Sequence, residues 1–223
     1  MKGAIFDVDG TLLDSMDMWN HAGELYLAGK NIAAPPELGK IMFPMTMVQA
    51  AKYMKAAYHL PDTVEEIIEG VDRTIDRFYR YEVKPKAGIL HFLQQMEKEG
   101  YVMVIATSSD RPLIEAAMER LGMARYFKRI FTCSEIGRGK SEPDIYEAAR
   151  TFMGTEITKT WVFEDAIHAA RTAKKAGFRL AGVYDSSSEA EQEELKNISD
   201  WYSKDFYDFN SFRAAAGAVS ENG

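Results

Sequence analysis

The sequence of 223 residues predicts an α/β fold: a Rossmann-like, doubly wound parallel sheet, interrupted by an inserted α-helical domain. Two observations carry this prediction. Short apolar runs alternate with helical patterns over most of the chain, as expected for parallel strands that are covered by helices on both faces. The interval 14–84 instead reads as helix throughout and contains no convincing strand pattern.

The expected strands are continuous apolar runs rather than alternating ones, which is typical of strands buried on both faces. They are residues 3–6, 101–106, 129–132, 160–163 and 180–184. Helical patterns separate the later four strands, over residues 89–99, 111–121, 143–153 and 166–176. Pro112 stands near the start of the second of these helices and Gly122 follows its end, which is common helix punctuation.

The long interval near the N-terminus is the one break in this alternation. A crossover between parallel strands does not need so much chain. Helices are expected over 19–27, 47–58 and 64–81. We therefore expect two domains, an α/β core of residues 1–13 and 85–223 and a helical domain of residues 14–84.

Bulk properties exclude several classes of function. The formal net charge of −7 gives no general attraction for nucleic acid or for an anionic membrane. Cys133 is the single cysteine, so no internal disulfide can form. The N-terminus lacks the apolar region of a signal peptide, and no stretch has the apolar length of a membrane span. We expect a cytoplasmic protein without nucleic-acid or membrane partners; the sequence carries no indication of its oligomeric state.

Asp7 and Asp9 follow the first strand at its carboxyl end, where open α/β sheets bind ligands. Residues two apart on extended backbone point the same way. Two such carboxylates repel each other unless a cation lies between them or one is protonated. A hard divalent ion suits a site made only of oxygen ligands, although the pair alone is equally compatible with loop carboxylates that cap a turn.

Three further polar elements stand at or after strand ends. Thr107 and Ser108 end the second strand, Lys140 lies in the loop before the helix at 143, and Glu164 and Asp165 end the fourth strand. Each has an ordinary structural explanation, as a helix cap or a surface lysine. Because all four elements meet at one edge of the predicted sheet, together they indicate a single site.

These four elements resemble the motifs of the haloacid dehalogenase (HAD) superfamily, and the likeness covers residues 2 to about 184. The string Asp7-Val8-Asp9-Gly10-Thr11-Leu12 is highly specific when the other three accompany it. The helical insert resembles the α-helical cap of that superfamily, and the chain is most similar to its phosphoglycolate phosphatase and β-phosphoglucomutase branch. Ser141 departs from the family pattern, which often has proline there.

The resemblance implies a Mg²⁺-dependent phosphatase that hydrolyses a small phosphate ester. Asp7 would attack phosphorus and form an aspartyl-phosphate, which divides the reaction into two displacements. Asp9 would protonate the leaving oxygen and then deprotonate the attacking water. Lys140 would stabilise the charge of the transferring group.

The resemblance also implies which residues bind the phosphoryl group and the metal. Thr107 and the Ser108 amide would hold the transferring group. Mg²⁺ would be bound by Asp7, by the backbone carbonyl of Asp9, by Asp165 and by Glu164. The dehalogenases themselves lack the second aspartate, so Asp9 favours phosphate chemistry over dehalogenation.

The cap is expected to supply specificity. In the segment 39–45, Lys40 can meet a substrate anion, while Met42, Phe43 and Met45 either cover an apolar part of the substrate or pack the cap core. The second of these is the more common role of such side chains.

Two alternatives to hydrolysis remain open. A sugar phosphomutase of the β-phosphoglucomutase kind carries a histidine shortly after the first motif, where this chain has Trp19; His21 stands two residues further on. This difference favours hydrolysis. A non-catalytic binding protein that kept the fold is disfavoured because the acidic and basic motif residues are all present.

Overall fold

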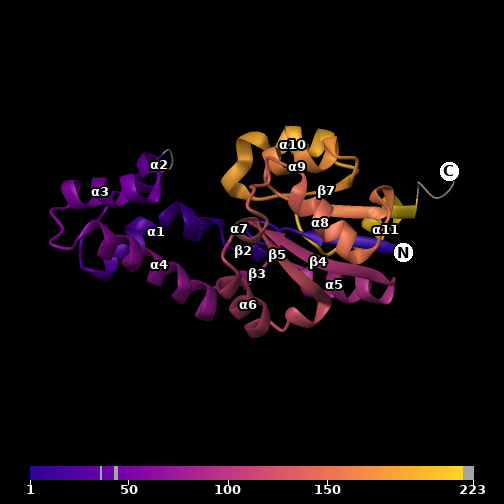
Figure 1. Ribbon diagram of the computed structural model, residues 1–223, viewed down its shortest axis with the longest axis horizontal. Helices are drawn as coiled ribbons and strands as arrows, with labels where there is room; N and C mark the ends of the chain where they lie inside the picture. Colours follow the sequence, from indigo (N-terminus) through magenta and orange to yellow (C-terminus); the bar gives the residue numbers. More distant parts are fainter. Residues whose placement is uncertain (36, 43–44, 218–223) are drawn as a thin grey trace. The chain divides into compact units, whose positions relative to one another are not determined.

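The α/β fold predicted from the sequence is confirmed by a computed structural model, which describes all residues except 36, 43–44 and 218–223. Six parallel strands form the sheet in the order β5-β4-β1-β6-β7-β8 (Figure 1). Their bounds are β1 Lys2–Phe6, β4 Tyr101–Thr107, β5 Phe127–Thr132, β6 Thr160–Glu164, β7 Arg179–Val183 and β8 Trp201–Ser203. Three of the four site motifs follow β1, β4 and β6, which are neighbours at the centre of the sheet, and Lys140 lies between α7 and α8.

Alternate side chains of the central strands enter two different cores, as expected for a sheet covered on both faces. Ile5 of β1 packs in a cluster with Ile145 and Ala149 of α8 (Asp144–Met153). Phe6, the next residue, stacks on Phe163 of β6 with ring centroids 4.1 Å apart. This second core is aromatic, and its other rings are Phe92, Trp161, Trp201, Phe206, Phe209 and Phe212.

The remaining helices of the α/β unit connect or cover these strands. They are α5 Ile89–Lys98, α6 Arg111–Arg120, α7 Cys133–Ile136, α9 Ile167–Lys175, α10 Gln192–Ile198 and α11 Phe209–Gly217. Helix α5 brings Phe92 into the aromatic core, and α11 brings Phe209 and Phe212. Helix α9 packs on β6 and β7 (Figure 1).

Two short strand pairings are absent from the sequence prediction. Strand β8 at the sheet edge has only three residues, too few for an apolar run to be recognised. Strands β2 (Leu13–Asp14) and β3 (Lys84–Pro85) form an antiparallel ribbon of two residues each. This ribbon joins the two chain segments that lead into and out of the helical interval.

Contacts divide the chain into two compact units, residues 1–14 with 84–223 and residues 15–83. The second unit consists of α1 Met16–Gly29, α2 Leu38–Met42, α3 Met47–Ala57 and α4 Val64–Tyr81. Thr46 and Thr63 begin α3 and α4 with capping boxes, each completed by the residue three positions later. Residues 39–42 of the segment 39–45, which the sequence suggests for substrate specificity, belong to the short helix α2. Among the described residues, no helix is long and apolar enough to cross a bilayer.

Candidate active site

The loop after β1 is folded tightly around one carbonyl group. The Val8 carbonyl accepts hydrogen bonds from the amides of Leu12 and Leu13 at 2.9 Å each. Gly10 has a φ of +81°, a conformation that side-chain-bearing residues adopt only with strain. The Asp7 amide donates to the Phe163 carbonyl of β6 at 3.0 Å. The backbone on either side of Asp7 is therefore anchored, and the Asp7 side chain emerges at the carboxyl edge of the sheet.

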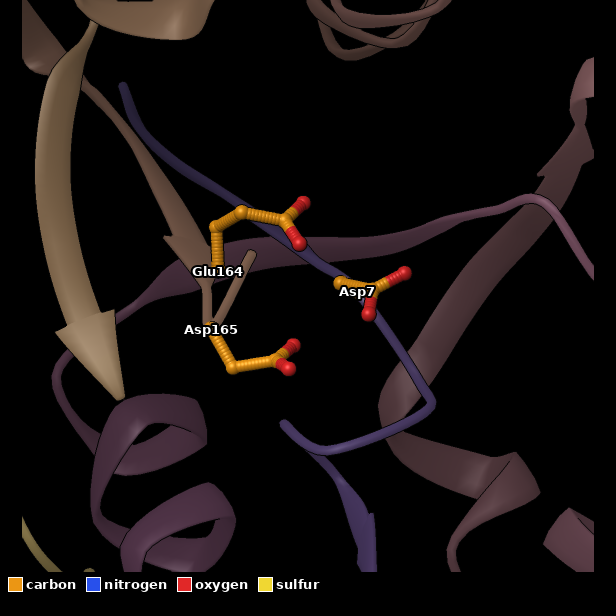
Figure 2. A group of neighbouring side chains, drawn as sticks. All are labelled: Asp7, Glu164 and Asp165. Carbon is orange, nitrogen blue, oxygen red and sulfur yellow. The ribbon is translucent and has the colours of Figure 1, made fainter. Parts of the chain in front are cut away.

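Three buried carboxylates meet at this edge. Asp7 comes from the segment after β1, and Glu164 and Asp165 come from the end of β6 (Figure 2). Each offers an oxygen that lies within 4.8 Å of the others. Thr11 donates its hydroxyl to Asp165 Oδ1 at 2.9 Å, which orients the third carboxylate. Such a cluster of oxygen ligands is suited to a hard divalent cation.

Lys140 is the cation of the cluster. Its side chain is 5% exposed, and its ammonium donates to Asp7 Oδ1 and, at 2.8 Å, to Glu164 Oε2. The same Glu164 oxygen accepts the Tyr146 hydroxyl of α8 at 3.2 Å. A buried charge is tolerated only when it is paired and hydrogen-bonded, and Lys140 meets both conditions. Glu164 therefore holds Lys140 against Asp7.

The electrostatics of the cluster favour an additional positive charge. Burial and the neighbouring Glu164 raise the pKa of Asp7 to about 8, although Lys140 opposes this shift. Burial, Asp7 and Glu164 raise the pKa of Asp165 well above its usual range. Burial alone would lower the pKa of Lys140, but Asp7 and Glu164 raise it, so Lys140 stays protonated. The two aspartates resist ionisation because they are buried and because one lysine does not balance three carboxylates.

A second chain of hydrogen bonds links Asp9 to the end of β4. Ser109 donates its hydroxyl to Asp9 Oδ2 at 2.6 Å. The Ser109 amide in turn donates to Thr107 Oγ1 at 3.0 Å. Because this amide occupies a lone pair of the buried Thr107 hydroxyl, the hydroxyl proton can be donated to another acceptor. Asp9 lies beside the acidic cluster along the chain, but its carboxylate is not one of the three clustered groups.

The residues expected at the site fall into three groups in the structure. Asp7, Lys140, Glu164 and Asp165 are in one buried cluster, and Asp9 and Thr107 are joined through Ser109. Ser108 is exposed, with its hydroxyl 3.4 Å from Cys133 Sγ. Lys40 is exposed on α2 of the helical unit, and Phe43 lies outside the described residues.

Three contacting residues were not identified from the sequence. Thr11 stands inside the first motif, so the motif itself was the signal for it. Ser109 ends the second motif segment, residues 106–109, but the roles expected for that segment fall on Thr107 and the Ser108 amide. Tyr146 lies six residues after Lys140 in α8. Its position on the buried face of the helix gives no sign in the sequence that its hydroxyl contacts Glu164.

Replacement of Gly10 by alanine tests how closely the first loop must approach Asp165. A Cβ on Gly10 would lie 2.3 Å from Asp165 Oδ2. Gly100 is a matched control because its φ is +77° and a Cβ there would meet nothing within 4 Å. We expect G100A to cost about 1–2 kcal/mol of unfolding free energy from backbone strain alone, with activity retained. G10A should cost more and lower the activity of the site about 100-fold by displacing Asp165. Equal stability losses in urea unfolding, or an active G10A, would contradict the close approach.

Comparison with known proteins places this site in a family. Residues 4–183 match the family model of haloacid dehalogenase-like hydrolases. The chain is 29% identical over 198 residues to a phosphoglycolate phosphatase of Agrobacterium fabrum, covering 81% of this chain and 79% of the relative. It is 25% identical over 185 residues to hexitol phosphatase A of Escherichia coli, covering 82% of each protein.

A solved structure supports the fold independently. A Thermotoga maritima protein assigned as a β-phosphoglucomutase superimposes with a TM-score of 0.85 at 21% identity, over 96% of this chain and 99% of the other. The family match covers both halves of the site, from Asp7 to Asp165, and the two relatives compared by sequence are named as phosphatases. The chain belongs to the haloacid dehalogenase-like hydrolases, and within them it is similar to phosphatases and to a β-phosphoglucomutase-like protein.

Proposed function

We propose that this protein is a Mg²⁺-dependent phosphatase that hydrolyses a small phosphorylated metabolite through a phosphoryl group on Asp7. The observation that carries the proposal is the buried contact of Asp7 with Lys140, next to Asp165. A carboxylate is a poor nucleophile toward an anionic phosphate unless positive charge offsets the repulsion. The lysine supplies part of that charge at the attacking oxygen.

The chemistry proceeds in two displacements at phosphorus. In the first, an Asp7 carboxylate oxygen forms a bond to phosphorus while the bond to the ester oxygen breaks, and Asp9 gives its proton to that leaving oxygen. In the second, Asp9 takes a proton from water as the water oxygen bonds to phosphorus and the bond to Asp7 breaks. Thr107 and the Ser108 amide would donate hydrogen bonds to the phosphoryl oxygens, and Lys140 would offset their charge.

The acidic cluster fits Mg²⁺ by charge and by ligand type. Three carboxylates and one lysine leave two formal negative charges, which one Mg²⁺ balances. Asp7, Asp165 and the Asp9 backbone carbonyl would hold the ion. Glu164 Oε2 already accepts two hydrogen bonds, so we expect Glu164 to act mainly on Lys140. When bound, Mg²⁺ supplies charge neutralisation and orients a phosphoryl oxygen.

Thermal unfolding tests the metal site without any substrate. At ten times its dissociation constant, Mg²⁺ should stabilise the native state by about 1.4 kcal/mol and raise Tm by roughly 3–6 °C. Asp165→Asn keeps an acceptor for Thr11 but removes one charge, so we expect it to fold and to lose this shift. An equal shift in wild type and D165N would place the ion elsewhere.

A phosphomutase is the second candidate, and the structure favours it less. The Trp19 indole donates to the Tyr79 hydroxyl at 2.9 Å and offers no titratable group. His21 interacts along its own helix, 2.8 Å from the Asp17 carbonyl and 3.7 Å from Glu24. Trp19 therefore cannot transfer a proton, and the contacts of His21 within its own helix do not indicate a role in mutase chemistry.

Substrate identity calls for a screen. Relatives act, by name, on phosphoglycolate, hexitol phosphates and phosphorylated carbohydrates. We propose that the helical unit acts as a cap that selects among such esters, with Lys40 as a cation for a second anionic group. Release of inorganic phosphate should be measured over a panel of these esters with Mg²⁺ and with a chelator. Isomerisation of β-glucose 1-phosphate with a bisphosphate primer and without phosphate release would favour the mutase. Absence of both reactions would favour a binding protein.

A further inference from the structure

Ser109 donates a short hydrogen bond to Asp9, the residue proposed as the general acid. Its oxygen–oxygen distance of 2.6 Å is at the short end of the range for O–H···O hydrogen bonds. The two residues lie 100 positions apart, on the loops that follow β1 and β4. The contact therefore joins the acid–base residue of one motif to the phosphoryl-binding loop of another.

We propose that Ser109 is a positioning residue for Asp9, and this inference rests on the proposed function. Ser109 holds Asp9 Oδ2, so that Oδ1 carries the proton that moves to the leaving oxygen. In the second displacement, the same Oδ1 receives the proton of the attacking water. The Ser109 hydroxyl keeps its own proton throughout, so it orients the acid without exchanging with it.

The backbone of Asp9 is already fixed, so its side-chain rotamer decides where the two carboxylate oxygens lie. Gly10 donates its amide to the Leu13 carbonyl at 3.0 Å, and Asp9 pairs with Leu13 in a β-bridge. An aspartate side chain still has two rotatable bonds. A donor on one carboxylate oxygen selects among its rotamers and so determines where the other oxygen points.

Ser109 is itself held well enough to do this. Its amide donates to Thr107 Oγ1 at 3.0 Å, and Thr107 is fully buried at the end of β4. Ser109 is half-buried, and its hydroxyl is held by the hydrogen bond that it donates to Asp9. Hydrogen bonds thus connect Thr107 to Ser109 and Ser109 to Asp9. Thr107, which is proposed to bind the phosphoryl group, holds Ser109 in place, and Ser109 orients Asp9.

The dependence of rate on the leaving group distinguishes this role from a structural one. General acid catalysis matters for a poor leaving group such as an alkoxide and little for p-nitrophenolate, which leaves without a proton. We expect S109A to lower kcat/KM for a sugar or alkyl phosphate about 10–100-fold, mainly through kcat. For p-nitrophenyl phosphate, kcat/KM should fall less than about threefold, because the acid is not needed to expel that group.

Three further variants complete the test. Ser109→Thr retains a hydroxyl and should restore most of the activity on the alkyl ester. Ser109→Cys replaces the hydroxyl by a thiol, a weak donor of similar size, and should behave like S109A. It provides a second measurement of the leaving-group dependence if S109A does not fold. Ser186→Ala removes an exposed serine elsewhere and should behave like wild type. Thermal unfolding verifies that each variant is native.

Two results would overturn the inference. Equal losses on both esters would show that Ser109 contacts the phosphoryl group or supports the fold, and an unchanged rate on the alkyl ester would show that it does nothing for Asp9. A wild-type protein that hydrolyses neither ester would instead refute the proposed function, and this inference with it. Wild-type activity on both esters is therefore the measurement that separates the two failures.

Discussion

Asp7→Asn should lose phosphatase activity by about four orders of magnitude or more while remaining folded. The amide is nearly isosteric with the carboxylate and can still accept a hydrogen bond from Lys140, which also keeps Glu164 as a partner. It cannot attack phosphorus to give an acyl phosphate, so the first displacement has no nucleophile. The measurement is kcat/KM on the best ester of the screen, with far-UV circular dichroism to verify the fold.

Asp17→Asn is the matched control for loss of a single carboxylate. Asp17 lies on α1 with its side chain 93% exposed, so its removal changes the net charge equally but should leave activity unchanged. If D7N retained more than about one per cent of wild-type activity in a preparation free of wild type, the nucleophile would have to be another group.

Lys140→Met should combine a large loss of activity with a large loss of stability. Removing one partner of a buried ion pair typically costs about 3–5 kcal/mol, because the remaining charge is left without compensation. Here two carboxylates, Asp7 and Glu164, lose their shared cation. Activity should fall about 1,000-fold, since the charge that stabilises the transferring group is also lost. Urea unfolding and kcat/KM measure the two effects.

The stability loss of K140M should also grow with pH. When folding raises the pKa of a carboxyl group, the native state loses stability as the pH rises from the pKa of the unfolded state to the pKa of the folded state. Above the folded-state pKa there is no further loss. In the wild type without metal, the loss due to Asp7 ends near its folded pKa of about 8. In K140M the pKa lies higher still, so the loss continues above that pH.

The difference in unfolding free energy between wild type and K140M, measured without Mg²⁺, should therefore be larger at about pH 9 than at about pH 6. Lys159→Met is the control, because Lys159 pairs with Glu156 on the surface and such exposed pairs contribute little. A difference that did not change with pH would mean that Lys140 stabilises the fold by packing rather than by charge.

The sequence predicted the sheet and the meeting of the motifs because both follow from local patterns. Continuous apolar runs identify buried parallel strands, and the carboxyl ends of such strands share one edge. Strand-end positions alone therefore predict that one edge of the sheet holds Asp7, Thr107, Lys140 and Asp165. The central strands β1, β4 and β6 are buried almost throughout, so the part of the fold that positions the site was the part most readable from sequence.

The contacts that refine the site depend on tertiary geometry that no local pattern records. Whether Glu164 meets the metal or Lys140 depends on side-chain direction at a strand end, which its neighbours do not reveal. Ser109 and Tyr146 have ordinary roles in isolation, as a cap and a core aromatic. Strand β8 and helix α2 were missed because three- and five-residue elements carry too little periodicity.

The most direct test of the account is to trap the phosphoryl group on the enzyme. Wild-type protein should be mixed with the best substrate and Mg²⁺, quenched with acid during turnover, digested and analysed by mass spectrometry. We expect one additional phosphoryl group on the peptide that contains Asp7, absent from D7N treated in the same way. A phosphoryl group on any other residue, or turnover without a trapped phosphoenzyme under single-turnover conditions, would contradict Asp7 as the nucleophile.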